Sequence, residues 1–456
     1  MAEELDVEFV IVGAGFAGLA AAWHLAKAGK RVAVLEARDR VGGRVKTIQR
    51  QGMWLDLGGT WFGPGQKHSY ELAAEMGVAL YPTYNSGDFL FVPDNGEPIR
   101  SPLQFPWQGI VPAAALLVLL DQFESMARQV PLDGPWTSEH ALEWDSQTLG
   151  HWIDSETSDS SLEAARTALR TTFIGLFCVD PSEISLLDAL HLVHSHGGFQ
   201  HLMSVQGGDQ QDRVVGGAQE IADRVHARLK DAVRLNEPVR KIVDDGNVVT
   251  VTSTNLVVRA SRAIVTIPLP LVGNIRFEPE LPKDRIQLQK AAQFGFVLKV
   301  VTTYSRPFWR DEEVGLSAGS FALTDPVGVT FDGGTNTNGP GLLISFMFGP
   351  NAVAVRNLSE TERRATIRDS LIRRFGPAGG EFYDYHEIEW ADEQWTQGGM
   401  FAHFSPGALT SFGPFLRQPC GLIHWAGTET STEFHGSING AIESGLRAAN
   451  EVLKSH

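Results

Sequence analysis

Apolar positions near the start of the chain change their spacing twice within forty residues. VEFVIVG, at 7–13, is a continuous β-branched run that ends in glycine, which predicts a buried parallel strand. FAGLAAAWHLAKAG, at 16–29, then has helical spacing and stops at Gly29. RVAVLEA, at 31–37, reads as a second buried strand that ends near an acid. Together these runs predict a βαβ unit.

Later segments alternate between strand and helix patterns. Strand-like runs at 233–268, separated by turn signals such as Asp245-Gly246, predict an antiparallel layer beside the parallel sheet. The stretch 83–213 is richer in helical patterns and tryptophan, whereas 289–395 mixes strands with the helix TERRATIRDSLIRRFG. The longest apolar run, IVPAAALLVLL at 110–120, is too short to span a membrane and predicts a buried helix.

Composition narrows the class of protein. A chain of 456 residues, 43% hydrophobic and 20% charged, predicts a soluble globular protein of two domains. Its net charge of −16 argues against nucleic acid or an anionic membrane as a partner. The acidic start, MAEELDVEF, shows no signal peptide, and two cysteines, Cys178 and Cys420, do not make a disulfide framework. A cytoplasmic location is therefore expected.

The turn of the βαβ unit carries three glycines in the GxGxxG pattern: Gly13, Gly15 and Gly18. The first allows the tight turn, the second lets a pyrophosphate approach, and the third permits close helix–strand packing. Glu36, at the end of the second strand, is placed to accept a hydrogen bond from a ribose hydroxyl. A purely structural turn would not need the strand, helix and acid in this register.

A second glycine pair, Gly42 and Gly43, favours FAD over NAD. It lets another segment run close to the cofactor, which a larger dinucleotide lying deep in the protein requires. Arg38 and Arg44, in the same stretch, can offset the diphosphate charge.

Several motifs together resemble the flavin-dependent amine oxidases, the family of monoamine and polyamine oxidases, and in particular soluble bacterial members. They are GAGFAGLAAA, LEARDRVGGR, DLGGTWFGPGQ at 56–66 and HWAGTETSTEFHGSINGAIESGLRAA at 424–449. RVVGGAQEIADRV, EPVRKI, FGFVLKVVTTYSRPFW and WADEQWTQGGMF fall between them in the family's order. The resemblance therefore covers nearly the whole chain.

The resemblance implies a mixed α/β fold with a discontinuous Rossmann-like FAD-binding domain, here 1–82, 214–288 and 396–456. The substrate-binding domain, a mixed sheet backed by helices, would comprise 83–213 and 289–395. The cofactor contacts carried over from the family are Gly13, Gly15, Gly18, Glu36, Arg38, Gly43, Arg44, Gly58, Gly59, Thr60, Val239, Trp390, Glu429 and Ile438.

Lys299, in the apolar pattern FGFVLKVV, matches the family lysine that holds a water against flavin N5. A lysine among apolar neighbours is costly to bury, and the alternative is an edge-strand lysine that points to solvent. Met400 departs from the family, because members with covalently attached flavin have cysteine there. Since a thioether has no thiol to bond the ring and Cys178 and Cys420 lie elsewhere in the pattern, we expect non-covalent FAD.

The family commonly frames the substrate amine between two aromatic rings. Phe401 occupies the first place, whereas the second falls on Ser437, which leaves half of the cage missing. Ser437 would then make room for a bulkier substrate or donate a hydrogen bond, or it would simply cap a helix. Leu202, Met203 and Gln210 align with residues that line the family's substrate cavity and suggest an apolar pocket.

The predicted activity is FAD-dependent oxidation of an amine by O₂, with Lys299, Phe401 and Ser437 at the reacting centre and no metal. HSHGGFQH, with His194, His196 and His201, lacks the supporting ligands of a metal site. A primary amine with an apolar body is favoured over nicotine-like cyclic or secondary amines and over polyamines. A non-catalytic dinucleotide-fold regulator is the alternative from another class, and a homodimer stays open.

Overall fold

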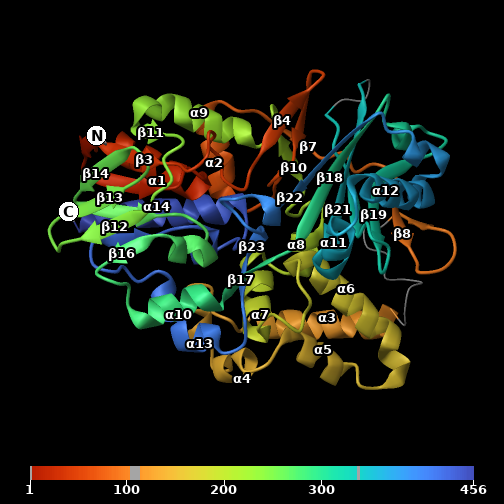
Figure 1. Ribbon diagram of the computed structural model, residues 1–456. Helices are drawn as coiled ribbons and strands as arrows, with labels where there is room; N and C mark the ends of the chain where they lie inside the picture. The colour runs from red at the N-terminus through yellow and green to blue at the C-terminus, as the bar shows by residue number, and fades with distance from the viewer. Residues whose placement is uncertain (1–2, 103–112, 336–338, 456) are drawn as a thin grey trace.

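The computed structural model describes residues 3–102, 113–335 and 339–455. A parallel sheet with its helices holds both chain ends, a seven-stranded sheet lies on the other side, and a group of helices lies below them (Figure 1). This arrangement confirms the predicted mixed α/β fold with a Rossmann-like unit.

The Rossmann-like sheet consists of five parallel strands whose residues are largely buried. In spatial order they are β11 (Val233–Arg234), β3 (Val32–Leu35), β2 (Phe9–Val12), β15 (Arg262–Val265) and β24 (Ile423–Trp425). The helices that pack together on this unit are α1 (Phe16–Lys27), α2 (Lys67–Met76), α9 (Gln219–Leu229) and α14 (Ile438–Lys454). α1 and α14 cross so closely that a Cβ added to Gly445 would lie 2.1 Å from the carbonyl oxygen of Ala17.

A second five-stranded sheet covers the other face of the parallel sheet, and the two share a core of valine, isoleucine and leucine. Its strands, in order, are β1 (Glu3–Asp6), β14 (Leu256–Ala260), β13 (Val249–Thr252), β12 (Lys241–Asp244) and β16 (Arg276–Glu278). The neighbours β12, β13 and β14 are antiparallel, as predicted. The prediction for the whole of 233–268 was wrong, however, because β11 and β15 pair in the parallel sheet. Periodicity alone does not show which sheet a buried strand joins.

The seven-stranded sheet and two helices form a separate layer. Its strands, in order, are β22 (Asp384–Glu389), β18 (Val297–Tyr304), β21 (Gly341–Phe348), β20 (Val329–Asp332), β19 (Leu316–Ala322), β8 (Asp88–Val92) and β9 (Ile99–Ser101). α11 (Gly349–Arg356) and α12 (Glu360–Phe375) pack against it. α12 confirms the helix predicted from TERRATIRDSLIRRFG. It begins in a capping box in which Ser359 and Glu362 satisfy each other's backbone amides.

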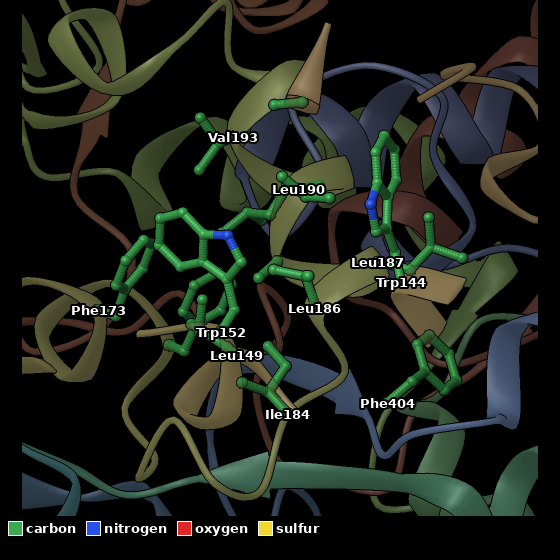
Figure 2. Packing of buried hydrophobic residues seen from close by; sticks show 14 of the residues in the cluster. Trp144, Leu149, Trp152, Phe173, Ile184, Leu186, Leu187, Leu190, Val193 and Phe404 are labelled. Atoms are coloured by element: carbon green, nitrogen blue, oxygen red, sulfur yellow. The ribbon is translucent and has the colours of Figure 1, made fainter. Parts of the chain in front are cut away.

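A group of helices completes the fold around an aromatic and aliphatic core (Figure 2). They are α3 (Ala113–Ala127), α4 (Ala141–Asp145), α5 (Leu149–Glu156), α6 (Glu163–Phe177), α7 (Leu186–Ser195), α8 (Phe199–Met203), α10 (Lys283–Ala291) and α13 (Ala408–Phe412). Part of the predicted helix at 110–120 lies outside the described residues. The rest belongs to α3, which is not fully buried, since Leu117 is 51% and Val118 65% exposed. Within the described ranges, no helix has both the length and the apolar character that a membrane span needs.

Three small sheets join these layers. They are β6 (Trp61–Phe62) with β10 (Asp212–Val214) and β7 (Leu80–Pro82), the hairpin of β4 (Thr47–Arg50) and β5 (Met53–Asp56), and the pair β17 (Ala292–Gly295) and β23 (Gly399–Phe404). The last pair joins segments predicted to belong to different domains. Phe404, on β23, also packs into the core of the helix group (Figure 2).

Candidate active site

One cavity of about 770 Å³ extends between the Rossmann-like unit, the seven-stranded sheet and the helix group. Its volume is in the range of ligand and cofactor sites. Nearly all of the predicted site residues line it. They are Gly13, Gly15, Glu36, Arg38, Gly43, Arg44, Gly58, Gly59, Thr60, Val239, Trp390 and Ile438 for the cofactor, and Lys299, Phe401, Ser437, Leu202, Met203 and Gln210 for the reaction.

The β2–α1 turn forms the wall at one end of the cavity. Gly13 has φ +101°, and Gly15 is the N-cap of α1 without any side-chain cap. A Cβ on Gly15 would have no neighbour closer than the Cα of Gly43, at 3.9 Å. The first turn of α1 therefore presents backbone and the positive end of a helix dipole to a ligand. Gly18 lies behind this wall, where a Cβ would come 1.9 Å from the oxygen of Gly13.

Glu36 is held in place by backbone amides at the end of β3. Its Oε2 accepts from the amide of Ala14 at 2.7 Å, and its Oε1 accepts from that of Arg38 at 3.0 Å. The side chain is only 3% exposed but still lines the cavity. This fixed carboxylate is in the position from which a ribose hydroxyl would be recognised.

The two arginines predicted to offset a diphosphate already have carboxylate partners. Arg38 binds Glu393 through two nitrogens, and Arg44 donates to Glu429 at 2.7 Å. Glu429 does not line the cavity itself. Burial opposes its charge, but Arg44 outweighs this effect and lowers the pKa of Glu429. Most of the charge on these arginines is thus compensated within the chain, which differs from the sequence-based expectation.

Lys299 is deeply buried in the interior strand β18, which excludes the solvent-facing alternative. Its Nζ donates to the carbonyl of Gly58 at 2.8 Å and to Oγ1 of Thr60 at 2.5 Å. Trp61 and Phe346 present their rings to it, each at 5.3 Å. Burial lowers the pKa of Lys299 to about 7, so a neutral amine is accessible at the cavity wall near neutral pH.

Ser437 is the N-cap of α14, as one of the two readings predicted. Its hydroxyl donates to the carbonyl of Phe434 at 2.6 Å and accepts from the amide of Gly440 at 3.0 Å. In this structure the hydroxyl proton of Ser437 has an acceptor within the chain, and a hydrogen bond from Ser437 to substrate stays a prediction. The residue still lines the cavity, and its small side chain leaves space there.

The ring beside Phe401 belongs to a residue that the sequence did not single out. The imidazole of His435 lies 5.7 Å from Phe401 in an edge-on contact and is 3% exposed. Burial lowers the pKa of His435 to about 3, which keeps the ring neutral.

The three histidines of HSHGGFQH do not share a common partner. His194 bonds to the carbonyl of Val130, whereas His196 and His201 both face Asp209. Among the described residues, no group of histidine, cysteine or acidic side chains could hold a metal ion. Asp209, which also accepts from Gln66, was missed because only the fold brings it to His196.

The family model of the flavin containing amine oxidoreductases matches residues 16–453. The chain belongs to this family. Amine oxidase [flavin-containing] B of Sus scrofa is 34% identical to this amine oxidoreductase, over 99% of this chain and 87% of that protein. A structure of putrescine oxidase bound to putrescine is 33% identical, with a TM-score of 0.93, and covers 99% of this chain and 100% of its own. Cyclohexylamine oxidase from Brevibacterium oxydans IH-35A gives the same identity and TM-score over 99% of both chains.

The cavity of this amine oxidoreductase fits the family's FAD. Gly15 and Gly43 leave the backbone bare where a Cβ would intrude, and Glu36 is fixed beside them. The N-termini of α1 and α14 both reach the wall, at Gly15 and Ile438. Such helix ends stabilise negative charge on a bound group. When bound, the flavin supplies the two-electron acceptor.

The apolar part of the cavity wall is more aromatic than the sequence indicated. Besides Leu202 and Met203, its wall includes residues of β19, β20 and β21: Phe321, Val329, Phe331, Phe346 and Phe348. Phe346 and Phe348 are two positions apart on one strand and stack at 5.6 Å. This period of two was the available signal for a shared face.

Proposed function

We propose that this amine oxidase oxidises a primary amine with a single charge and an apolar body. The imine would hydrolyse to an aldehyde or ketone, and O₂ would be reduced to H₂O₂. The chain contributes an apolar wall that orients the C–H bond, and a neutral Lys299 that can hold a water or proton. The predicted contacts of Phe401, Trp390 and Val239 with substrate or cofactor are part of this proposal.

The carboxylates of the cavity wall support the choice of a substrate with a single charge. Among its described lining residues, the only carboxylates are Glu36 and Asp209. Glu36 is fixed by the amides of Ala14 and Arg38, while Asp209 is paired with His196 and Gln66. The second ammonium group of a diamine would therefore lose its hydration without gaining a free carboxylate.

A peroxide-coupled assay tests this substrate class. We expect kcat/KM for cyclohexylamine to exceed that for putrescine by at least about tenfold, since an unpaired buried charge costs several kcal/mol. Nicotine belongs in the same assay, because the small Ser437 leaves room for a cyclic amine. Equal or better turnover of putrescine would contradict the proposal, and a colourless, inactive protein would favour a regulator.

The FAD is expected to be bound without a covalent link. Met400 lines the cavity at the family's attachment position. Cys178 is closer than the sequence suggested, because its thiol contacts the Met400 backbone, but it is fully buried. Burial raises the pKa of this thiol to about 12 and keeps it protonated and unreactive. After acid precipitation the yellow colour should remain in the supernatant, whereas a yellow pellet would show a covalent bond.

We further propose a soluble cytoplasmic enzyme that acts on a small amine and O₂ and has neither nucleic acid nor a membrane as partner. The net charge of −16 supports the last two points.

A further inference from the structure

The connection from β22 to β23, residues 390–398, lines the cofactor end of the cavity through Trp390 and 394–397. It comes from the seven-stranded layer, yet it reaches two loops of the Rossmann-like unit. These loops are the stretch after β3, which holds Glu36 and Arg38, and the turn after β11, which holds Val239 and Arg240. The three segments together surround this end of the cavity.

The first attachment of the 390–398 connection is a two-point contact between Arg38 and Glu393. Arg38 Nε donates to Oε1 of Glu393 at 3.0 Å, and Nη2 donates to Oε2 at 2.5 Å. The same Nη2 reaches Oγ1 of Thr396 at 2.5 Å, and Nη1 lies 3.4 Å from Oε1 of Glu36. One guanidinium thus joins Glu36, the predicted ribose acceptor, to the 390–398 connection.

The second attachment involves an aromatic ring. Arg240 lies over the ring of Trp395 at 5.6 Å, and both residues line the cavity. The turn that holds Arg240 is itself fixed to the first loop, since the amide of Asn236 donates to the carbonyl of Arg38 at 2.8 Å. Both attachments therefore link the 390–398 connection to two loops that are themselves hydrogen-bonded to each other.

A neighbouring ion pair of the same connection is more exposed to solvent. Asp392 pairs with Arg356 on α11, and their side chains are 61% and 37% exposed. Glu393 is 24% and Arg38 10% exposed by the same measure. Of these adjacent acids, Glu393 pairs with an arginine that lines the cavity, whereas Asp392 pairs with one that does not, which supplies a matched control.

We propose that the 390–398 connection is a clasp that retains the dinucleotide, with Glu393 and Trp395 as its positioning residues. FAD leaves only when the contacts Arg38–Glu393 and Arg240–Trp395 open together. In an enzyme whose flavin has no covalent attachment, this closure sets the rate of cofactor loss. The inference rests on the family's flavin and on its non-covalent binding, but not on the amine substrate proposed above.

The test measures release of FAD from the purified holoenzyme by the rise in flavin fluorescence after dilution. Glu393→Gln keeps the shape of the side chain but removes its charge. It is expected to raise the dissociation rate at least about tenfold, because hydrogen bonds between charged groups are the stronger kind. Trp395→Leu removes the second contact without changing any charge and should also accelerate release. Asp392→Asn should release FAD at the wild-type rate.

The unfolding temperatures of the three variant apoproteins show whether a substitution affects folding and not only the retention of FAD. They are expected to agree with that of the wild type within a few degrees. Release from the wild-type holoenzyme should also accelerate between low and high salt, since the Arg38–Glu393 pair is partly exposed to screening. Wild-type release rates in both Glu393→Gln and Trp395→Leu would overturn the clasp. If neither variant folds, salt-independent release from the wild type would overturn it.

Discussion

Replacing Lys299 with methionine is expected to slow flavin reduction or reoxidation at least about a hundredfold while FAD stays bound. The buried Lys299 Nζ donates hydrogen bonds to Gly58 and Thr60, both of which line the cofactor cavity. Methionine preserves much of the side-chain volume but removes the donor and the proton. Stopped-flow measurement of the two half-reactions, beside the FAD dissociation constant, gives the result.

Lys241→Met is the control, because Lys241 lies on β12 of the second sheet, where its partly exposed side chain pairs with Glu278. It should leave both half-reactions unchanged. Wild-type rates in both half-reactions of Lys299→Met would show that the lysine is only structural.

The pH dependence of the free energy of unfolding tests the burial of Lys299 independently of turnover. Burial lowers its folded pKa to about 7, whereas an unfolded lysine titrates near 10.4. Between these values the unfolded chain binds a proton that the folded chain lacks, so the free energy of unfolding rises with pH. Lys299→Met should remove this rise, which urea unfolding at about pH 7 and pH 9.5 would detect. Lys241→Met should retain it.

Gly15→Ala is expected to weaken FAD binding at least about a hundredfold without unfolding the apoprotein. The added Cβ would have no neighbour within 3.9 Å in the chain, and φ at this position is −71°, which alanine adopts freely. The methyl group would instead occupy the path by which a pyrophosphate reaches the amides of α1. Losing one or two charge-assisted hydrogen bonds accounts for this factor.

Gly134→Ala is a control, because Gly134 is the N-cap of the short 3-10 helix Pro135–Thr137 and its Cβ would make an ordinary contact at 3.4 Å. Both variants should show a similar small loss of helix-cap stability. Isothermal titration of each apoprotein with FAD compares the affinities. Equal affinities would show that the dinucleotide does not pass Gly15.

The sequence predicted those parts of the site that depend on local pattern. The glycines of the β2–α1 turn, the acid at the end of β3 and the buried lysine of β18 each carry their own chemical signal. Contacts between separate segments had no such signal in the sequence. Arg38 binds Glu393, which is 355 residues away, and Asp209 contacts His196 only because of the fold. The same limitation explains the error over 233–268, since pairing partners and not periodicity decide which sheet a strand joins. The helix cap formed by Ser437 was among the sequence-based expectations, whereas its second hydrogen bond, to the carbonyl of Phe434, was not.

The order of the chain in the Rossmann-like unit has a consequence for biosynthesis. β2 and α1 are translated long before β24 and α14, against which the unit closes. The side of α1 that faces α14 therefore stays exposed on the nascent chain until α14 has been made, because Gly445 must arrive before Ala17 is covered. Contacts this far apart in sequence also form slowly. Gly15 and Ile438 line the same cavity, so the complete cofactor site cannot form before α14 has been made.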